Sequence, residues 1–146
     1  EAGLCLYGND LNENTTPVEA SLNWAIHKNR RIGGKKQGGF IGDKVILYQL
    51  QSGTEMKRVA LSPKERAPIR EGCKLFEKIE SEFSIGSVTS GGFSPTLQKP
   101  ISLAYIKCNL AKNENEIYAE VRGKRMPVVV TSLPFVKTKY KLRRKD

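Results

Sequence analysis

Residues 116–131 read EIYAEVRGKRMPVVVT and have the pattern of a β-hairpin. Apolar and polar residues alternate over 116–122, as in a strand with one face in a core and the other in solvent. Gly123 and Lys124 make a tight turn, and 125–131 is the returning strand. This segment therefore predicts antiparallel β-structure towards the end of the chain.

Short apolar segments separated by glycine and proline precede the hairpin. We expect four further strands, at 57–61, 74–76, 85–89 and 101–108. Residues 67–70 are expected to be extended, because a proline biases the residue before it away from helix. Residues 91–95 contain two glycines and a proline and indicate a connection. Six short strands over 56–136 predict a small closed or sandwiched β domain.

The first fifty residues have a different pattern, which predicts a strand followed by helices. Residues 2–7 are mainly apolar and follow Glu1, so we expect a short strand that ends at a turn over 8–10. A helix is expected over 16–31 and a shorter amphipathic helix over 40–47. The fold class is thus mainly β with an α/β piece at the N-terminal end.

The start of the helix expected over 16–31 is well marked. Thr16 suits the N-cap, Pro17 suits the first helical position, and Glu19 completes a capping box with Thr16. Apolar residues then recur at every fourth position, which gives the helix one apolar face. Cations at 28–31 suit its negative C-terminal end.

The net charge of +10 is concentrated in two segments. Residues 28–36 and 137–145 are rich in lysine and arginine, whereas residues 1–27 carry only acidic charges. A basic chain attracts anions such as nucleic acid, anionic lipid or a small polyanion. The glycine-rich segment 32–39 lacks the GxxxxGK[ST] order of a phosphate-binding loop, so we expect a flexible turn there.

Metal, disulfide and nucleophile signatures are missing from the sequence. Cys5, Cys73 and Cys108 form no CxxC pair, so we expect free, buried thiols in a reducing compartment. His27 is the one histidine and is expected on the surface. No apolar run approaches the length of a membrane span.

Three motifs, in order along nearly the whole chain, resemble one protein family. They are EAGLCLYGNDL at 1–11 followed by TTPVEASLNWAIHKNRR at 15–31, then IGSVTSGGFSPTL at 85–97 followed by ISLAYI at 101–106, and LPFVKTKY at 133–140. This pattern is similar to that of aminomethyltransferases, the T-proteins of the glycine cleavage system. Members of the family are much longer than this chain. The resemblance therefore implies the C-terminal portion of such a protein.

The resemblance implies a fold and a reaction. Family members have three domains, so residues 1–50 would end the folate-binding middle domain and 51–146 would form the C-terminal β-barrel. The reaction moves the one-carbon unit from the aminomethyl-lipoyl group of the H-protein to tetrahydrofolate and releases ammonia, in glycine catabolism and one-carbon metabolism. The family's catalytic aspartate lies in the N-terminal half, so the chain alone is expected to be inactive.

The resemblance also implies partners and a location. The partners would be the lipoylated H-protein and the missing N-terminal half, with no metal, no membrane and no nucleic acid. Lys137 and Lys139 would face the acidic lipoyl carrier. The protein would be mitochondrial in a eukaryote and cytoplasmic otherwise.

Four residues are carried over as folate-binding candidates. Glu1 matches the glutamate of the EAGL motif, and its carboxylate could accept two N–H groups of a pterin. Arg30 matches a ligand-contacting arginine, with Arg31 as its immediate rival. Tyr140 lies in the closing motif and could hydrogen-bond or stack on the ligand. Arg70 matches an arginine close to the active site.

Other functions remain open at this point. Within the superfamily, the folate domains of sarcosine or dimethylglycine dehydrogenases are alternatives, although the closing motif fits them less well. From another class, the chain could be a small basic β-barrel that binds RNA or single-stranded DNA. Such a barrel needs aromatic residues interleaved with the cations, and here the basic clusters lie outside the expected strands. A structural dimerisation module is a third possibility.

Overall fold

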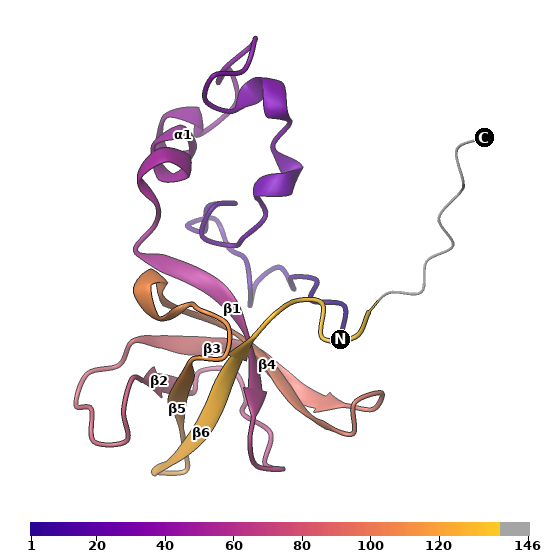
Figure 1. The fold of residues 1–146 in the computed structure, drawn as a ribbon, viewed down its shortest axis with the longest axis vertical. Coiled ribbons are helices and arrows are strands. Elements are labelled where there is room, and N and C mark those ends of the chain that lie inside the picture. The colour runs from indigo at the N-terminus through magenta and orange to yellow at the C-terminus, as the bar shows by residue number, and fades with distance from the viewer. Residues whose placement is uncertain (138–146) are drawn as a thin grey trace.

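A computed structural model describes residues 1–137 and contains a closed barrel of six antiparallel strands (Figure 1). The strands follow the spatial order β1-β4-β3-β2-β5-β6. Their bounds are β1 Met56–Pro63, β2 Lys74–Phe76, β3 Gly86–Ser94, β4 Lys99–Lys107, β5 Glu116–Val121 and β6 Lys124–Thr131. One α-helix, α1 (Asp43–Ser52), and the segment that precedes it lie above the barrel in Figure 1, while the N-terminus lies beside the barrel. This arrangement confirms the predicted mainly β fold.

The barrel closes around the alternating residues that predicted its strands. On β5, Ile117 and Ala119 are fully buried, and on β6 the same is true of Val128. These side chains join a single apolar cluster with residues of β1, β2, β3 and β4. Removal of this apolar surface from water is the main force that holds the six strands together.

Strand β3 is longer than predicted. It continues through Ser94, with a register shift between Val88 and Ser90, where a connection was expected over 91–95. A Cβ at Gly91 would lie 1.9 Å from the carbonyl oxygen of Ile69. The glycine therefore marks a close approach of another chain segment rather than a break in the strand. Residues 67–70 form no strand, and Ile69 is buried at this crossing.

The predicted helix over 16–31 does not form. Its capping box is present, since Thr16 N donates to Glu19 Oε2 at 2.9 Å and Glu19 N donates to Thr16 Oγ1 at 3.2 Å. However, Ser21 has a φ of +57°, and only two short 3-10 helices follow, η1 (Asn23–Ala25) and η2 (Lys28–Arg30). A third, η3 (Cys108–Leu110), follows β4.

Two other expectations for the N-terminal segment need correction. Residues 2–7 form no strand, because their only ladder contact among residues 1–137 is a parallel bridge between Tyr7 and Leu11. The turn after them is present, with Asp10 N donating to Leu6 O. The second predicted helix forms as α1, which begins and ends later than the expected 40–47.

Two buried charged residues fasten the N-terminal segment to the barrel. Arg58 of β1 is 6% exposed, and its Nε donates to Ala20 O at 2.8 Å while Nη1 donates to Gly3 O at 3.1 Å. Its backbone N–H donates to Glu19 O. The Ala20 carbonyl thus accepts a bond from the barrel, where a helix would have bonded it internally, which explains why the capped turn does not extend.

Asp10 provides the second fastening. It is 2% exposed, and its carboxylate accepts hydrogen bonds from Thr89 Oγ1 at 2.5 Å, from Ser90 Oγ at 2.8 Å and from Leu6 N at 2.8 Å. Tyr105 of β4 donates its hydroxyl to the Asp10 carbonyl at 2.9 Å. A buried carboxylate is tolerated because these donors replace water.

Arg58→Met should release the N-terminal segment while the barrel persists. The change leaves the carbonyls of Gly3 and Ala20 without their donor, at a cost of about 1–3 kcal/mol each when buried. Hydrogen exchange should show faster exchange of the amides of residues 16–22 and unchanged protection in β5 and β6. Arg66→Met, at an exposed position, is the matched control. Unchanged exchange at 16–22 would contradict this role of Arg58.

Candidate functional site

A cavity of about 470 Å³ lies where the N-terminal segment crosses the end of β3 and the beginning of β4. One wall consists of residues 1–4 with Leu6 and Asp10, and the other consists of residues 90–94 and 101–103. Phe135, from the segment after β6, also lines it. The walls are mainly apolar, and the polar lining residues are two acids and three serines, a mixture that is usual for a small-molecule site.

Glu1 lies at the edge of this cavity and is held by the β3–β4 turn. Its Oε1 accepts hydrogen bonds from Ser94 Oγ at 2.5 Å and from Thr96 N at 3.0 Å. Its Oε2 accepts one from Thr96 Oγ1 at 2.7 Å. These bonds, Ser94 first, lower the pKa of Glu1 from 4.5 to about 2.

The Glu1 carboxylate is therefore ionised at neutral pH and has a defined position. A carboxylate offers about four lone-pair sites, and three are used by Ser94 and Thr96. One site on Oε2 is left for a ligand donor. A ligand with two adjacent N–H groups would have to share or displace one of the Thr96 bonds.

The two basic candidates of the N-terminal segment lie elsewhere and bond to nearby backbone. Arg30 is exposed, and its Nη1 donates to Gly38 O at 2.9 Å. Arg31 donates through Nε to Ile26 O and through Nη2 to Asn23 O. Neither arginine lines the Glu1 cavity. Arg30 therefore keeps more unused donors than Arg31.

Arg70 approaches the same strand as Glu1 from a different side. It is exposed, and its Nη1 donates to the carbonyl of Gly91 on β3 at 3.3 Å. It lines a second, larger cavity and not the one at Glu1. Tyr140 lies outside the described residues. Among the carried-over residues, the structure thus brings Glu1 and Arg70 to β3 and leaves Arg30 apart.

Several residues of the site were missed by sequence reasoning. Ser94 and Thr96 hold Glu1, although the stretch containing them was expected to be a simple connection. Asp10 lines the cavity and fastens its wall. Ser94 and Thr96 belong to the resembling stretch at 85–97, which was the available signal for them. Asp10 likewise belongs to the resembling stretch at 1–11, although no hydrophobic pattern around it predicted its burial.

Within residues 1–137, the other pKa shifts arise from burial or from hydrogen bonds among Lys64, Glu116 and Tyr118, and they mark no reactive centre. Burial raises the pKa of the Cys5 thiol and raises that of Tyr105 to about 12. Cys108 is exposed, so its predicted burial was wrong, because it lies where β4 has left the barrel. His27 is exposed, as predicted. Residues 1–137 contain no metal-ligating cluster.

The helices carry no membrane signature. Within residues 1–137, none of them has both the length and the apolar content that a membrane crossing requires. The three thiols are free, and Cys5 and Cys73 are half-buried.

Comparisons with known proteins agree with the motifs. Residues 57–137 match the glycine cleavage T-protein C-terminal barrel domain. The mitochondrial aminomethyltransferase of Pisum sativum is 46% identical over 145 residues, which is 96% of this chain and 33% of that protein. That of Dictyostelium discoideum is 45% identical over 97% of this chain and 34% of its own length.

A solved structure has the same fold. The crystal structure of glycine cleavage system aminomethyltransferase T from Bartonella henselae superposes with a TM-score of 0.83 and 42% identity. The match covers 92% of this chain and 36% of that one. The chain therefore spans about a third of the length of the relatives that it matches.

The hydrogen bonds to Glu1 predict a pH dependence. Because its pKa in the folded state is lowered from 4.5 to about 2, its stabilising effect is fully present above 4.5 and is lost as the pH falls towards 2. An NMR titration of the Glu1 carboxyl carbon should show a midpoint near 2. Ser94→Ala should move that midpoint upward, whereas Ser87→Ala, at an exposed position, should not. A wild-type midpoint near 4.5 would contradict the contacts.

Proposed function

Because the chain belongs to the glycine cleavage T-protein family, whose C-terminal barrel domain it contains, we propose that it is the C-terminal portion of an aminomethyltransferase. The whole protein would move the one-carbon unit from the aminomethyl-lipoyl group of an H-protein to tetrahydrofolate and release ammonia. The match at 57–137, with relatives aligned over nearly the whole chain, is the observation that carries this proposal. In a eukaryote the protein would be located in the mitochondrion, as the names of the relatives suggest.

Glu1 would bind the pterin ring of the folate. Its carboxylate is ionised and lies at the mouth of a mainly apolar cavity, which suits a flat ring with polar edges. A pterin presents a ring N–H beside an exocyclic amino group, and a carboxylate can accept both. Ser94 holds the acceptor in place before the ligand arrives, which lowers the entropy cost of binding, and the second N–H of the pterin would share or displace a Thr96 bond.

The arginines and Tyr140 would act on other parts of the ligand. Arg30 uses one nitrogen for Gly38 O, and its remaining donors suit a carboxylate of the folate tail. Arg70 is a second candidate for a polar group of the ligand. Tyr140 would hydrogen-bond or stack on it. Since folate is held by hydrogen bonds and charge, the chain would contribute mainly positioning to the reaction.

The rest of the folate site would be supplied by a longer polypeptide. The exposed apolar residues of the N-terminal segment support this, since Trp24 is 77% exposed and α1 contains no buried residue. Apolar patches of this kind mark surfaces that a partner covers. We propose that these surfaces are covered by the part of the protein that corresponds to the remaining two-thirds of the relatives' length. The catalytic aspartate of the family would lie there.

A nucleic-acid-binding barrel is less well supported. The exposed Phe83 lines a cavity together with Glu77 and Glu82, and these acids would repel a phosphate backbone. Phe93, the other exposed phenylalanine, lines the Glu1 cavity. The curated relatives named above are aminomethyltransferases.

Tetrahydrofolate binding tests the proposal by calorimetry. The chain alone should neither bind folate tightly nor turn over substrate, whereas a mixture with the N-terminal two-thirds of the protein should bind. In the mixture, Glu1→Gln or Arg30→Gln should weaken binding about tenfold or more, because each removes a charge-assisted bond. Lys28→Gln, which removes a neighbouring exposed charge, is the matched control for Arg30. No binding in the mixture, or turnover by the chain alone, would contradict the proposal.

The affinity for a lipoylated H-protein tests the proposed partner. Lys137 is exposed, and Lys139 lies outside the described residues. Reversal of both charges to glutamate should weaken binding of an acidic H-protein and reduce the dependence of its affinity on salt. Reversal of Lys57 and Lys107, which are exposed on the barrel, is the charge-matched control. If the wild type, the variant and the control bound the H-protein with equal affinity, Lys137 and Lys139 would be excluded from the interface.

A further inference from the structure

The barrel has a second cavity, separate from the one at Glu1. Its volume is about 830 Å³, and it lies between the segment that follows β1 and the β5–β6 hairpin. One side of the cavity is apolar and is lined by Pro68, Val121 and Met126, and the other side is charged. It shares no lining residue with the Glu1 cavity.

The charges around this cavity are strongly unbalanced. Arg70, Arg122, Lys124 and Arg125 line it, and Glu65 is the one acid among the lining residues. Of the four cations, Arg125 has an ion pair, with Glu120. The other three have no ion pair within residues 1–137. Cations from two separate segments converge on one concave site, which raises the local concentration of anions.

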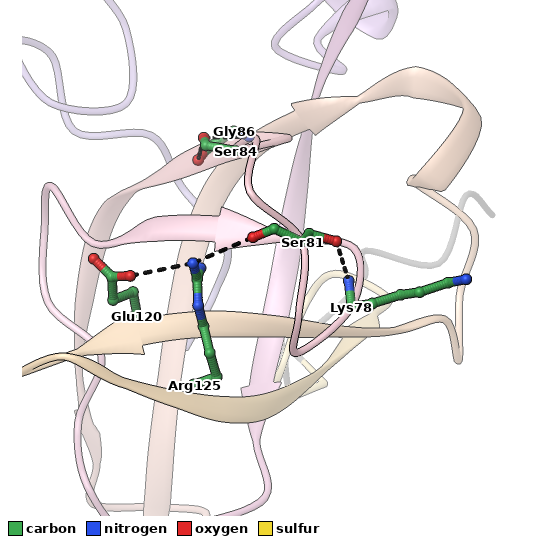
Figure 2. A network of polar contacts seen from close by, with 6 residues as sticks. All are labelled: Lys78, Ser81, Ser84, Gly86, Glu120 and Arg125. Atoms are coloured by element: carbon green, nitrogen blue, oxygen red, sulfur yellow. Dashed lines mark hydrogen bonds and ion pairs between the residues drawn. The ribbon is translucent and has the colours of Figure 1, made fainter.

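The side chain of Arg125, which lines the cavity, is held in place by its neighbours. Its guanidinium carbon lies 3.0 Å from the centre of the Phe76 ring. Nη2 lies 3.3 Å from Glu120 Oε2 and donates to Ser81 O at 3.4 Å, as Figure 2 shows. Stacking and pairing immobilise the side chain. Its Nη1 is buried and has no acceptor within residues 1–137, which is unusual in a native fold.

Arg122 has a backbone conformation, required by its turn, that is unfavourable for arginine. Val121 pairs with Lys124, so Arg122 and Gly123 form the two-residue loop of the hairpin, with φ values of +51° and +75°. Such loops prefer Asn-Gly, because asparagine tolerates positive φ better than a long side chain does. A strained residue at the edge of a cavity is an indication of function rather than of stability.

We propose that this cavity is a binding site for a small, multiply charged oxyanion. Guanidinium groups bind phosphate and carboxylate oxygens in paired geometry, and Lys124 adds a point charge. The concave shape suits a compact anion that enters it, rather than an extended backbone that lies across it. The proposal shares one residue, Arg70, with the folate-binding candidates, but it concerns a cavity separate from the one at Glu1. The variants that test it leave Arg70 unchanged, so its outcome can be told apart from that of the folate proposal.

Calorimetry with two probes tests the proposal on the full chain. Inorganic pyrophosphate represents clustered phosphates and citrate represents clustered carboxylates. The cavity variant, Arg122→Asn with Lys124→Gln, removes two charges from exposed positions, and Asn suits the turn, so folding should be preserved or improved. The control variant, Lys35→Gln with Lys36→Gln, removes the same charge from the glycine-rich segment.

The wild type should bind at least one probe with a millimolar or lower Kd. The cavity variant should bind about tenfold more weakly, and the control should stay within about twofold of wild type. Tighter binding of pyrophosphate would assign phosphate chemistry and tighter binding of citrate would assign carboxylates, while equal affinities would support their shared oxyanion chemistry. No binding of either probe would overturn the proposal. Equal weakening in both variants would also overturn it, since it would show attraction by net charge alone.

Discussion

The N-terminal segment depends on the Arg58 side chain for its place on the barrel. Taking a guanidinium out of water is costly unless its donors are satisfied, and here the carbonyls of Gly3 and Ala20 satisfy them. The buried Asp10 carboxylate is satisfied in a corresponding way, because two hydroxyls and one backbone amide donate hydrogen bonds to it. Each buried charge is therefore satisfied only when the segment and the barrel are together. The cavity at Glu1 exists because of this pairing.

Strand β3 is the part of the barrel that serves the site most directly. Its far end holds Glu1 through Ser94, and its Gly91 carbonyl accepts a bond from Arg70. The same glycine lets Ile69 cross the strand at close range. Residues 90–94 of β3 all pair with β4, so the groups attached to them keep defined positions. This rigidity suits a function in which the chain positions a ligand.

Much of the fold could be predicted because its causes are local. The alternation over 116–121, the hairpin and the turn over 8–10 follow from residues a few positions apart. The two-residue loop of the hairpin lies one residue earlier than predicted, at Arg122–Gly123, because Val121 pairs with Lys124. The capping box at Thr16 also formed as expected. The helix that it should have started did not, because Arg58, far away in sequence, takes the Ala20 carbonyl. A local pattern predicts the start of an element, but tertiary contacts decide whether the element continues.

The sequence by itself determined the β-strands, their alternating faces and the family motifs, including the motif glutamate at Glu1. These depend on residue type and spacing, which physical periodicity makes readable. Only the tertiary structure decided that β3 runs through Ser94, that Ser94 and Thr96 hold Glu1, and that Arg30 bonds to Gly38. It also gathered Arg70 and the hairpin cations around one cavity. Such groupings join residues distant in sequence, and their partners are set by the packing of the whole barrel rather than by any local pattern.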